Sequence, residues 1–403
     1  MAVSGRGSAL VLDVDTRAGL SCVRSLARAG VDVAAGARDA HASGMRTRCA
    51  SRRVILPDPR VDFDAHAAAI LAEVQANPVD AVFSSIDSSV EALHRRREEI
   101  GRFASVALGT PEAVEIALSK TRTLELAGAL GIASPRSVRA ATAPELEAAA
   151  AETGFPCVFK PETSWQPVGE GGERLGPVPV ADAEEARTVG SELQELGVPV
   201  LVQQLVRGVR ETVKLFRVEG KTVAVLAMSI DRTWPPLGGS SVMRRTIAPP
   251  DDVHSAAERL VAEIGLDGYS EVEFRRDDEG RALLMEVNPR LSQSVELAVR
   301  AGVDFPRMQF EWARGGHVPL PPAPVLGVRV GWAAGDLRLL VSSLRGAAPD
   351  GRGTGGLVRA FADDYVVHRA RLEGLDLHDL RPALGGISFA LGRIAARSES
   401  PSR

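Results

Sequence analysis

The stretch that decides the fold is Ser270-Glu271-Val272-Glu273-Phe274, followed after Asp277-Asp278-Glu279-Gly280 by Met285-Glu286-Val287-Asn288-Pro289-Arg290. The two halves predict a pair of neighbouring strands. X-Gly is a favoured pair for a two-residue turn, and a turn at Glu279-Gly280 places Glu273 directly opposite Glu286. Like charges paired across strands destabilise a sheet by up to about 1 kcal/mol, so this register favours a cation between the two carboxylates.

Asn288 adds an amide oxygen to this pair. It lies two residues beyond Glu286 and therefore on the same face of the strand. Two carboxylates and an amide oxygen form a hard, all-oxygen ligand set, which suits magnesium carried on nucleotide phosphates. The alternative is a solvated hairpin face with no ligand.

The bulk composition is that of an ordinary globular protein. A chain of 403 residues predicts about two or three domains. A formal net charge of −4 gives no general attraction to nucleic acid or to an anionic membrane. Cys22, Cys49 and Cys157 lack metal-binding spacing, and free thiols in a reducing cytoplasm are expected. No signal-peptide pattern and no run of roughly 18 apolar residues occurs, so neither export by that route nor a membrane span is expected.

The N-terminal part reads as a small α/β layer domain over residues 1–112. Ala9–Val14 and Val31–Ala35 predict strands around a helix at Leu20–Ala29, and three further short apolar runs predict strands near residues 53–56, 81–84 and 105–108. Gly19 is the only glycine in the first turn, where the dinucleotide-binding fingerprint needs three. NAD(P) binding is therefore not predicted.

The middle of the chain contains a strand that ends in a lysine and runs into a glycine-rich loop. Pro156–Lys160 predicts the strand, and the following residues, 161–179, include four glycines. A loop of that length inside a compact domain is usually functional or mobile. Lysine is otherwise scarce, since arginine is used in its place almost throughout. The lysines of the chain are Lys120, Lys160, Lys214 and Lys221.

The order of these motifs resembles the ATP-grasp superfamily. The matching pieces, over about residues 110–315, are Ser119-Lys120, Gly131–Pro135, Gly154–Lys160, Gln203-Gln204 before Gly208, Glu273, and Glu286–Arg290. The opening residues resemble the preceding Rossmann-like domain of carboxylate–amine ligases related to biotin carboxylase and to the ATP-grasp domains of carbamoyl-phosphate synthase. The resemblance implies a chain of mixed α/β and α+β class. A pre-ATP-grasp domain (1–112) would be followed by an ATP-grasp domain (113–318), which consists of a lid at about 137–203 and a large antiparallel subdomain. A C-terminal region (325–395) of unpredicted role and a disordered tail (396–403) would complete the chain.

The resemblance also implies site residues. ATP would be bound by Lys120, Lys160, Gln203, Gln204, Val206 and Glu211, the last on the ribose. The metal, Mg²⁺ or Mn²⁺, would be bound by Glu273, Glu286 and Asn288, and Arg290 would contact the transferring phosphate. Candidate substrate contacts are Arg244 and Arg245, in a variable loop, and Ser292 and Gln293. The segment Thr163–Gly176 would be the lid over the triphosphate, and Trp165 would either help to exclude water or pack on its own domain.

The predicted activity is ADP-forming ligation: ATP activates a carboxylate as an acyl-phosphate, and an amine attacks it to form an amide or peptide bond. The partners would be small-molecule substrates, with no nucleic acid or membrane, and the protein would be a cytoplasmic homodimer. Two alternatives stay open. One is a carboxylase or carbamoyl-phosphate-like enzyme, and the other is a non-catalytic ATP-binding regulatory protein.

Overall fold

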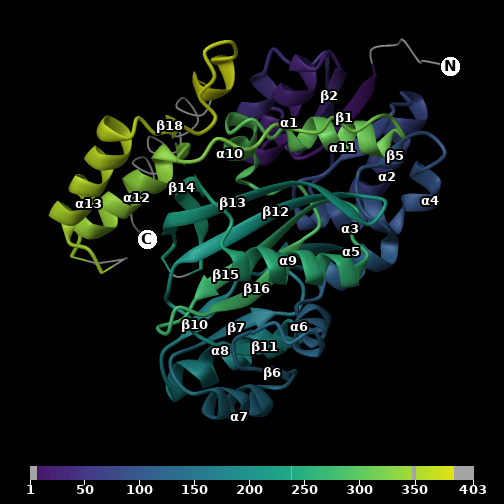
Figure 1. The fold of residues 1–403 in the computed structure, drawn as a ribbon. Helices are drawn as coiled ribbons and strands as arrows, with labels where there is room; N and C mark the ends of the chain where they lie inside the picture. The colour runs from purple at the N-terminus through teal and green to yellow at the C-terminus, as the bar shows by residue number, and fades with distance from the viewer. Residues whose placement is uncertain (1–6, 237, 347–350, 385–403) are drawn as a thin grey trace, which may run out of the picture.

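The structure is a computed structural model that describes residues 7–236, 238–346 and 351–384. Its three larger sheets are stacked along the molecule (Figure 1). The N-terminal sheet lies at the top of that view, a large sheet in the middle and a small sheet at the bottom, with the C-terminal helices beside the large sheet. Within the described ranges, no helix is long and apolar enough to cross a membrane.

The N-terminal sheet is parallel and has the strand order β3-β2-β1-β4-β5. Its strands are β1 (Ser8–Val11), β2 (Asp32–Ala37), β3 (Arg52–Ile55), β4 (Ala81–Phe83) and β5 (Ser105–Val106), and its helices are α1 (Arg17–Arg28), α2 (Phe63–Ala76), α3 (Asp87–Arg95) and α4 (Arg97–Ile100). The strands are largely buried because helices cover the sheet. Parallel strands bring their carboxyl ends to one edge, so Arg17, after β1, and Asp87, after β4, emerge at the same edge.

The small sheet is antiparallel and has the order β10-β7-β11-β6. Two helices, α5 (Pro111–Leu118) and α6 (Lys120–Ala129), lead to it, and its elements are β6 (Ser137–Ala140), α7 (Ala143–Thr153), β7 (Cys157–Pro161), β10 (Val178–Val180), α8 (Ala183–Glu195) and β11 (Val200–Gln204). Residues from α7 and α8 and from the strands form one separate apolar core. We propose that this unit is the predicted lid at about 137–203.

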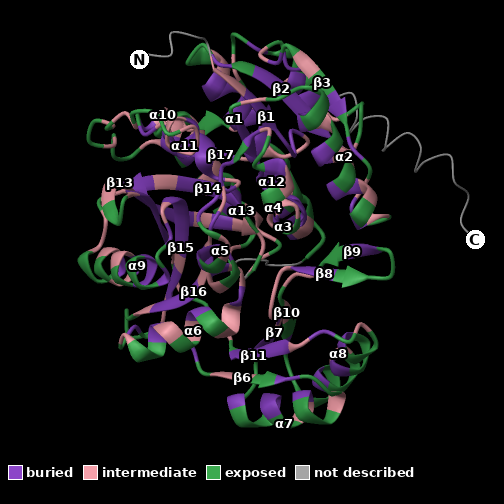
Figure 2. Cartoon of the chain, turned by 90° about the vertical axis from the view of Figure 1, so that its right-hand side faces the viewer, coloured by how far each residue is buried: buried purple, intermediate pink, exposed green. Residues whose placement is uncertain are grey.

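The large sheet has the order β16-β15-β12-β13-β14-β17-β18. Its strands are β12 (Arg210–Val218), β13 (Lys221–Trp234), β14 (Ser240–Ile247), β15 (Gly268–Arg276), β16 (Ala282–Asn288), β17 (Arg329–Gly331) and β18 (Arg371–Leu372). Helix α9 (Asp251–Ile264) packs its apolar side on one face through Val253, Leu260 and Val261, against Val213 and Val272. Figure 2 shows the buried residues along β13 and β15. The other face carries polar side chains, and it forms one wall of the site.

The decisive hairpin has the predicted register but not the predicted turn. Glu273 lies opposite Glu286, as expected. The connection, however, is a three-residue loop, closed by a hydrogen bond from Asp277 N to Arg281 O, with Gly280 at φ 79°. That loop alone would place Glu273 opposite Met285. A β-bulge between Glu273 and Phe274 leaves Met285 unpaired and restores the pairing of the two glutamates.

The C-terminal region extends the large sheet and reaches the N-terminal unit. Strand β17 pairs with β14 and then with β18, and α12 (Ala333–Leu344) and α13 (Thr354–Ala362) lie beside them. Helices α10 (Val295–Arg300) and α11 (Phe305–Ala313) connect the large sheet to this region. The predicted tail, 396–403, and residues 385–395 lie outside the described residues. The predicted domain boundaries stay proposals.

Candidate active site

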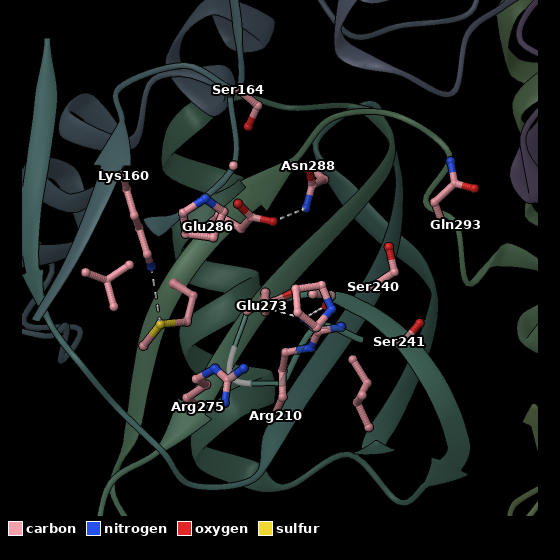
Figure 3. A pocket seen from close by; sticks show the side chains of 18 of the residues that line it. Lys160, Ser164, Arg210, Ser240, Ser241, Glu273, Arg275, Glu286, Asn288 and Gln293 are labelled. Atoms are coloured by element: carbon pink, nitrogen blue, oxygen red, sulfur yellow. Dashed lines mark hydrogen bonds and ion pairs between the residues drawn. The ribbon is translucent and has the colours of Figure 1, made fainter. Parts of the chain in front are cut away.

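A cleft of about 470 Å³ lies between the small and the large sheet. Most of the residues predicted for the site line it, as the close view shows in part (Figure 3). These residues are Lys120, Lys160, Gln203, Gln204, Val206, Glu273, Glu286, Asn288, Arg290, Ser292 and Gln293. Glu211, Arg244 and Arg245 are not among them. Elements separated by up to about half the chain thus converge on one cavity.

The carboxylate pair lies at the centre of the cleft. The Asn288 Nδ2 atom donates to Glu286 Oε1 at 3.1 Å, which leaves the amide oxygen free to bind a cation. Burial raises the pKa of Glu273, the nearby Arg210 opposes this, and the negative charge of Glu286 raises it further. Burial also acts to raise the pKa of Glu286, but Lys120, Asn288 and Lys160 together lower it. A bound cation would relieve the repulsion between the two carboxylates.

The donor set therefore fits magnesium carried on phosphate. Two carboxylates and one amide oxygen are too few to enclose the ion, and the described residues contain no cluster of three or more His, Cys, Asp or Glu side chains that would do so. Magnesium usually keeps one or two protein carboxylates and takes its remaining ligands from nucleotide phosphates and water. An incomplete set at the edge of a large cleft matches that requirement.

Two lysines face the carboxylates. Lys120, the first residue of α6, donates to Ser164 Oγ at 3.3 Å, and Lys160 on β7 hydrogen-bonds Gln203. Burial lowers the pKa of Lys160 to about 8, although Glu286 acts to raise it. Burial lowers the pKa of Lys120 as well, again opposed by Glu286. Cations buried beside so few carboxylates would be compensated by phosphate oxygens.

Arg290 is held by a residue that the sequence analysis missed. Its Nε atom donates to Asp87 Oδ1 at 2.6 Å, at the N-terminus of α3 in the N-terminal unit. Burial acts to raise the pKa of Asp87, but the Arg290 guanidinium together with Arg174 and Lys120 outweighs it, and the net shift is downward. The ion pair fixes the direction of the guanidinium in the cleft. No local motif marks Asp87, but its place just after a parallel strand could have identified it as a candidate.

The predicted adenine hinge lines the far end of the cleft. Val206 forms a small apolar cluster with Leu283 and Met285, which offers a surface for a flat ring. The Gln203 side chain is occupied by Lys160 and by Ser137 Oγ, the latter at 3.0 Å. The backbone N–H of Gln204 donates to Arg136 O, so base recognition at that amide is not supported.

Glu211 does not lie where the resemblance places it. It follows Arg210 on β12, and neighbouring residues of a strand point to opposite faces. Arg210 therefore lines the cleft, whereas Glu211 pairs with Arg276 at 2.8 Å on the face that α9 covers. The predicted ribose contact of Glu211 is therefore wrong for this structure. The polar residue that β12 places in the cleft is Arg210, whose Nη1 atom lies 3.5 Å from Glu273 Oε1.

The predicted substrate loop also needs correction. Arg245 pairs with Asp231 at 3.3 Å and lies outside the cleft. Arg244 is completely buried and is paired with Glu373 of the C-terminal region. Serines 240 and 241, at the start of β14, line the cleft instead, and so does Arg17. The sequence analysis missed Arg17 because nothing nearby in the sequence connects α1 with the large sheet.

Ser292 and Gln293 reach the cleft with their polar groups engaged. The Ser292 hydroxyl donates to Glu271 Oε2 at 2.9 Å and accepts from the buried Lys214 at 3.1 Å. Gln293 Oε1 accepts from the Ala18 backbone N–H at 3.4 Å. Both residues therefore belong to the wall where the large sheet meets the N-terminal unit, and Glu271 is a further carboxylate on that wall.

The glycine-rich segment forms a hairpin of β8 (Trp165–Val168) and β9 (Gly171–Arg174). Trp165 is buried against Phe63 of α2, with ring centroids 6.2 Å apart, so it packs on the N-terminal unit as well as on Gly172 of its own hairpin. The Glu170 carbonyl accepts from Phe63 N at 2.9 Å. A Cβ on Gly171 would lie 2.1 Å from Arg60 O, so only glycine permits this approach. The hairpin is docked on the N-terminal unit, and its last residue, Arg174, lines the cleft.

The pKa of Lys160 leads to a pH prediction. Because burial lowers that pKa to about 8, the free protein loses this positive charge above pH 8. We expect kcat/KM for ATP to fall above about pH 8, because kcat/KM reports ionisation in the free enzyme. We expect kcat to stay level over the same range, because bound phosphate raises the pKa of Lys160. Steady-state profiles from pH 6.5 to 9.5 test this. A Lys160→Arg variant should remove the alkaline limb, and an unchanged limb in that variant would contradict the assignment.

Fold and site together define the class. An N-terminal parallel sheet is followed by an antiparallel and a mainly antiparallel sheet, and the cleft between them holds facing lysines and carboxylates. This combination of fold and site is that of the ATP-grasp superfamily, which the chain resembles in sequence and in fold. Residues 198–335 match the family described as ATP-grasp in the biosynthetic pathway with Ter operon.

Known proteins agree with this class. The D-alanine–D-alanine ligase of Pseudomonas putida (strain GB-1) is 26% identical over 261 residues, which cover 59% of this chain and 77% of that protein. The solved L-amino acid ligase from Bacillus licheniformis has a TM-score of 0.60 at 16% identity and covers 78% of this chain and 74% of its own. The biotin carboxylase domain of the Hydrogenobacter thermophilus 2-oxoglutarate carboxylase has a TM-score of 0.64 at 15% identity, with coverages of 80% and 73%. The two structures show the fold alone.

Proposed function

We propose that the protein is an ATP-dependent, ADP-forming ligase that joins a small-molecule carboxylate to an amine. One observation carries this proposal: a single cleft is lined by Lys120, Lys160, Glu273, Glu286, Asn288 and Arg290. The lysines and the arginine supply positive charge for the phosphate oxygens of a magnesium–triphosphate complex, and the carboxylates and the amide supply oxygen ligands for its metal ion. The ligase relative supports the carboxylate–amine chemistry.

In the proposed site the lysines bind the phosphates, and the apolar cluster around Val206 packs against the base. Glu273, Glu286 and Asn288 would hold Mg²⁺ or Mn²⁺, which when bound neutralises charge on the phosphate oxygens. Arg290, fixed by Asp87, contacts the γ-phosphoryl group from the side of the N-terminal unit. The preorganised guanidinium stabilises the negative charge that spreads over the transferring group.

The reaction then proceeds in two steps. A carboxylate oxygen bonds to the γ-phosphorus, and the bond to the ADP oxygen breaks. The amine nitrogen next bonds to the acyl carbon, the phosphate leaves with the electrons of the C–O bond, and the nitrogen releases a proton. Water would destroy the acyl-phosphate, and the hairpin that Trp165 anchors on Phe63 would act as the lid that excludes it.

A coupled ADP-release assay tests the proposal. The purified protein is given MgATP and pools of small carboxylic acids, amino acids and amines, and products are identified by mass spectrometry. Release that needs both an acid and an amine is the expected result. Release that needs bicarbonate would instead support a carboxylase or carbamoyl-phosphate-like enzyme. Binding of ATP with no turnover in any pool would support a non-catalytic regulatory protein. The homodimer and the cytoplasmic location stay predictions.

A further inference from the structure

Arg17 places a positive charge in the cleft from the N-terminal unit. It is the first residue of α1, and its guanidinium lines the cleft with a side-chain exposure of 20%. Three partners fix it: Glu373 at 2.5 Å, the carbonyl of Ser241 at 3.3 Å, and the ring of Trp332, whose centroid is 4.7 Å away. Such a fixed guanidinium is prepared to bind a further group without losing side-chain entropy.

The charges around Arg17 do not balance within the protein. Glu373, whose side chain is 1% exposed, is shared between Arg17 and the completely buried Arg244. The Nε atom of Arg244 has no hydrogen-bond partner among the described residues. Burial lowers the pKa of Arg17 to about 10, so the group remains protonated at neutral pH. Glu296 and Glu271 also act on these two guanidinium groups, but each is paired with a cation of its own, Arg300 and Lys214. The group as a whole therefore keeps an excess positive charge, which favours an anion in the cleft.

This excess charge lies at the end of the cleft remote from the hinge. Strand β15 runs along the cleft through Arg275, Glu273 and Glu271, a span of about 13 Å at the usual strand rise. Arg275 donates to Gly208 O near the hinge, whereas Glu271 and Arg17 both act on the charge of Arg244. Arg17 therefore lies beyond the carboxylate pair when viewed from the adenine end, where a second substrate would approach the acyl-phosphate.

The C-terminal region fixes this arrangement. The backbone N–H of Gly374, next to Glu373, donates to Glu296 Oε2 of α10 at 2.9 Å. A few residues later, Asp379 accepts from Arg24 Nε of α1 at 2.9 Å and from Thr47 Oγ1 at 2.6 Å. The segment from Glu373 to Asp379 is thus attached both to the unit of the large sheet and to the N-terminal unit. Glu373 lies between Arg244 of the large sheet and Arg17 of the N-terminal unit.

We propose that Arg17 binds a free carboxylate carried by the amine substrate, and that Glu373 is a positioning residue supplied by the C-terminal region. A guanidinium recognises a carboxylate through paired N–H donors. The substrate class would be amines with their own carboxylate, such as free amino acids, in preference to the same molecules with the carboxylate blocked. This inference rests on the proposed function and assigns a role to the C-terminal region.

The test compares Arg17→Met, Arg17→Lys and Glu373→Gln with the parent. The control is Arg28→Met. Arg28 lies on the same helix and also pairs with the C-terminal segment, through Asp376, but its side chain is 55% exposed and lies outside the cleft. ADP release is measured with the twenty L-amino acids and with their carboxamides. We expect the parent to prefer the free acids by about 30-fold in kcat/KM, the size expected for one charge-assisted hydrogen-bonded pair.

In Arg17→Met this preference should disappear through a higher substrate KM, with the KM for ATP unchanged. Arg17→Lys should recover part of the preference, Glu373→Gln should weaken it, and Arg28→Met should retain it. A parent that accepts carboxamides as well as free acids would overturn the inference and leave the proposed function intact.

If no pool supports turnover, the proposed function fails and binding alone decides about Arg17. Succinate is then titrated calorimetrically into protein saturated with MgADP. Binding that Arg17→Met weakens by about tenfold or more, while Arg28→Met leaves it unchanged, supports an anion site at Arg17. No succinate binding, or equal binding by Arg17→Met, overturns it.

Discussion

A Glu286→Gln substitution is expected to abolish magnesium-dependent ADP release while the protein stays folded. Glu286 faces Glu273 across the hairpin, accepts from Asn288, and compensates the charges of Lys120 and Lys160. Loss of one metal carboxylate removes several kcal/mol of stabilisation from the transferring phosphoryl group, which corresponds to about a 10³-fold lower kcat. Magnesium titrations of ADP release measure this, and thermal unfolding reports on the fold.

The matched control for this variant is Glu279→Gln at the tip of the same hairpin, where the side chain is exposed and, among the described residues, pairs with Arg281 alone. It should behave like the parent. The neutral glutamine at 286 loses the attraction to Lys120 and Lys160 but also the repulsion with Glu273, and because the two changes oppose each other the unfolding temperature should fall by no more than a few degrees. A Glu286→Gln protein that releases ADP at the parental rate would show that the carboxylate pair is not the metal site.

The second large effect is expected at Arg290. An Arg290→Met variant should lose about 10²–10³-fold in kcat with little change in the KM for ATP, because a preorganised donor acts mainly on charge that develops in the transition state. Asp87→Asn should show a smaller loss, because Asp87 orients the guanidinium through its 2.6 Å hydrogen bond and does not itself line the cleft. Steady-state kinetics with the substrates found in the ADP-release assay measure both.

Arg281→Met, at the hairpin tip, serves as the control for the loss of an arginine. If Arg290→Met raised the KM for ATP and left kcat intact, Arg290 would be a ground-state nucleotide contact, and the proposed role in phosphoryl transfer would have to be abandoned.

The parts of the site that local pattern could predict are those within one strand or one hairpin. The pairing of Glu273 with Glu286 follows from the hairpin, although the predicted turn was one residue too short and the bulge at Met285 compensated for it. The same alternation of side chains that placed Asn288 correctly could have excluded Glu211. On β12 that alternation presents Arg210 to the cleft and turns Glu211 to the opposite face.

The remaining contributions come from elements that are distant in the sequence. Asp87 reaches Arg290 across 203 residues, and Arg17 reaches Glu373 across 356. Trp165 packs on Phe63 of another unit. Such contacts depend on how whole units pack, because each partner alone looks like an ordinary surface charge or a loop aromatic. Periodicity and spacing carry no signal for them.

The unpaired Met285 has a consequence for how this cleft can change. Neighbouring residues of a regular strand point to opposite sides, yet Met285 and Glu286 both line the cleft, because the bulge turns one of them around. The apolar surface next to Val206 and the proposed metal carboxylate Glu286 therefore depend on the same local distortion. A substitution that straightens this strand is therefore expected to alter the packing surface for a base and the placement of that carboxylate together.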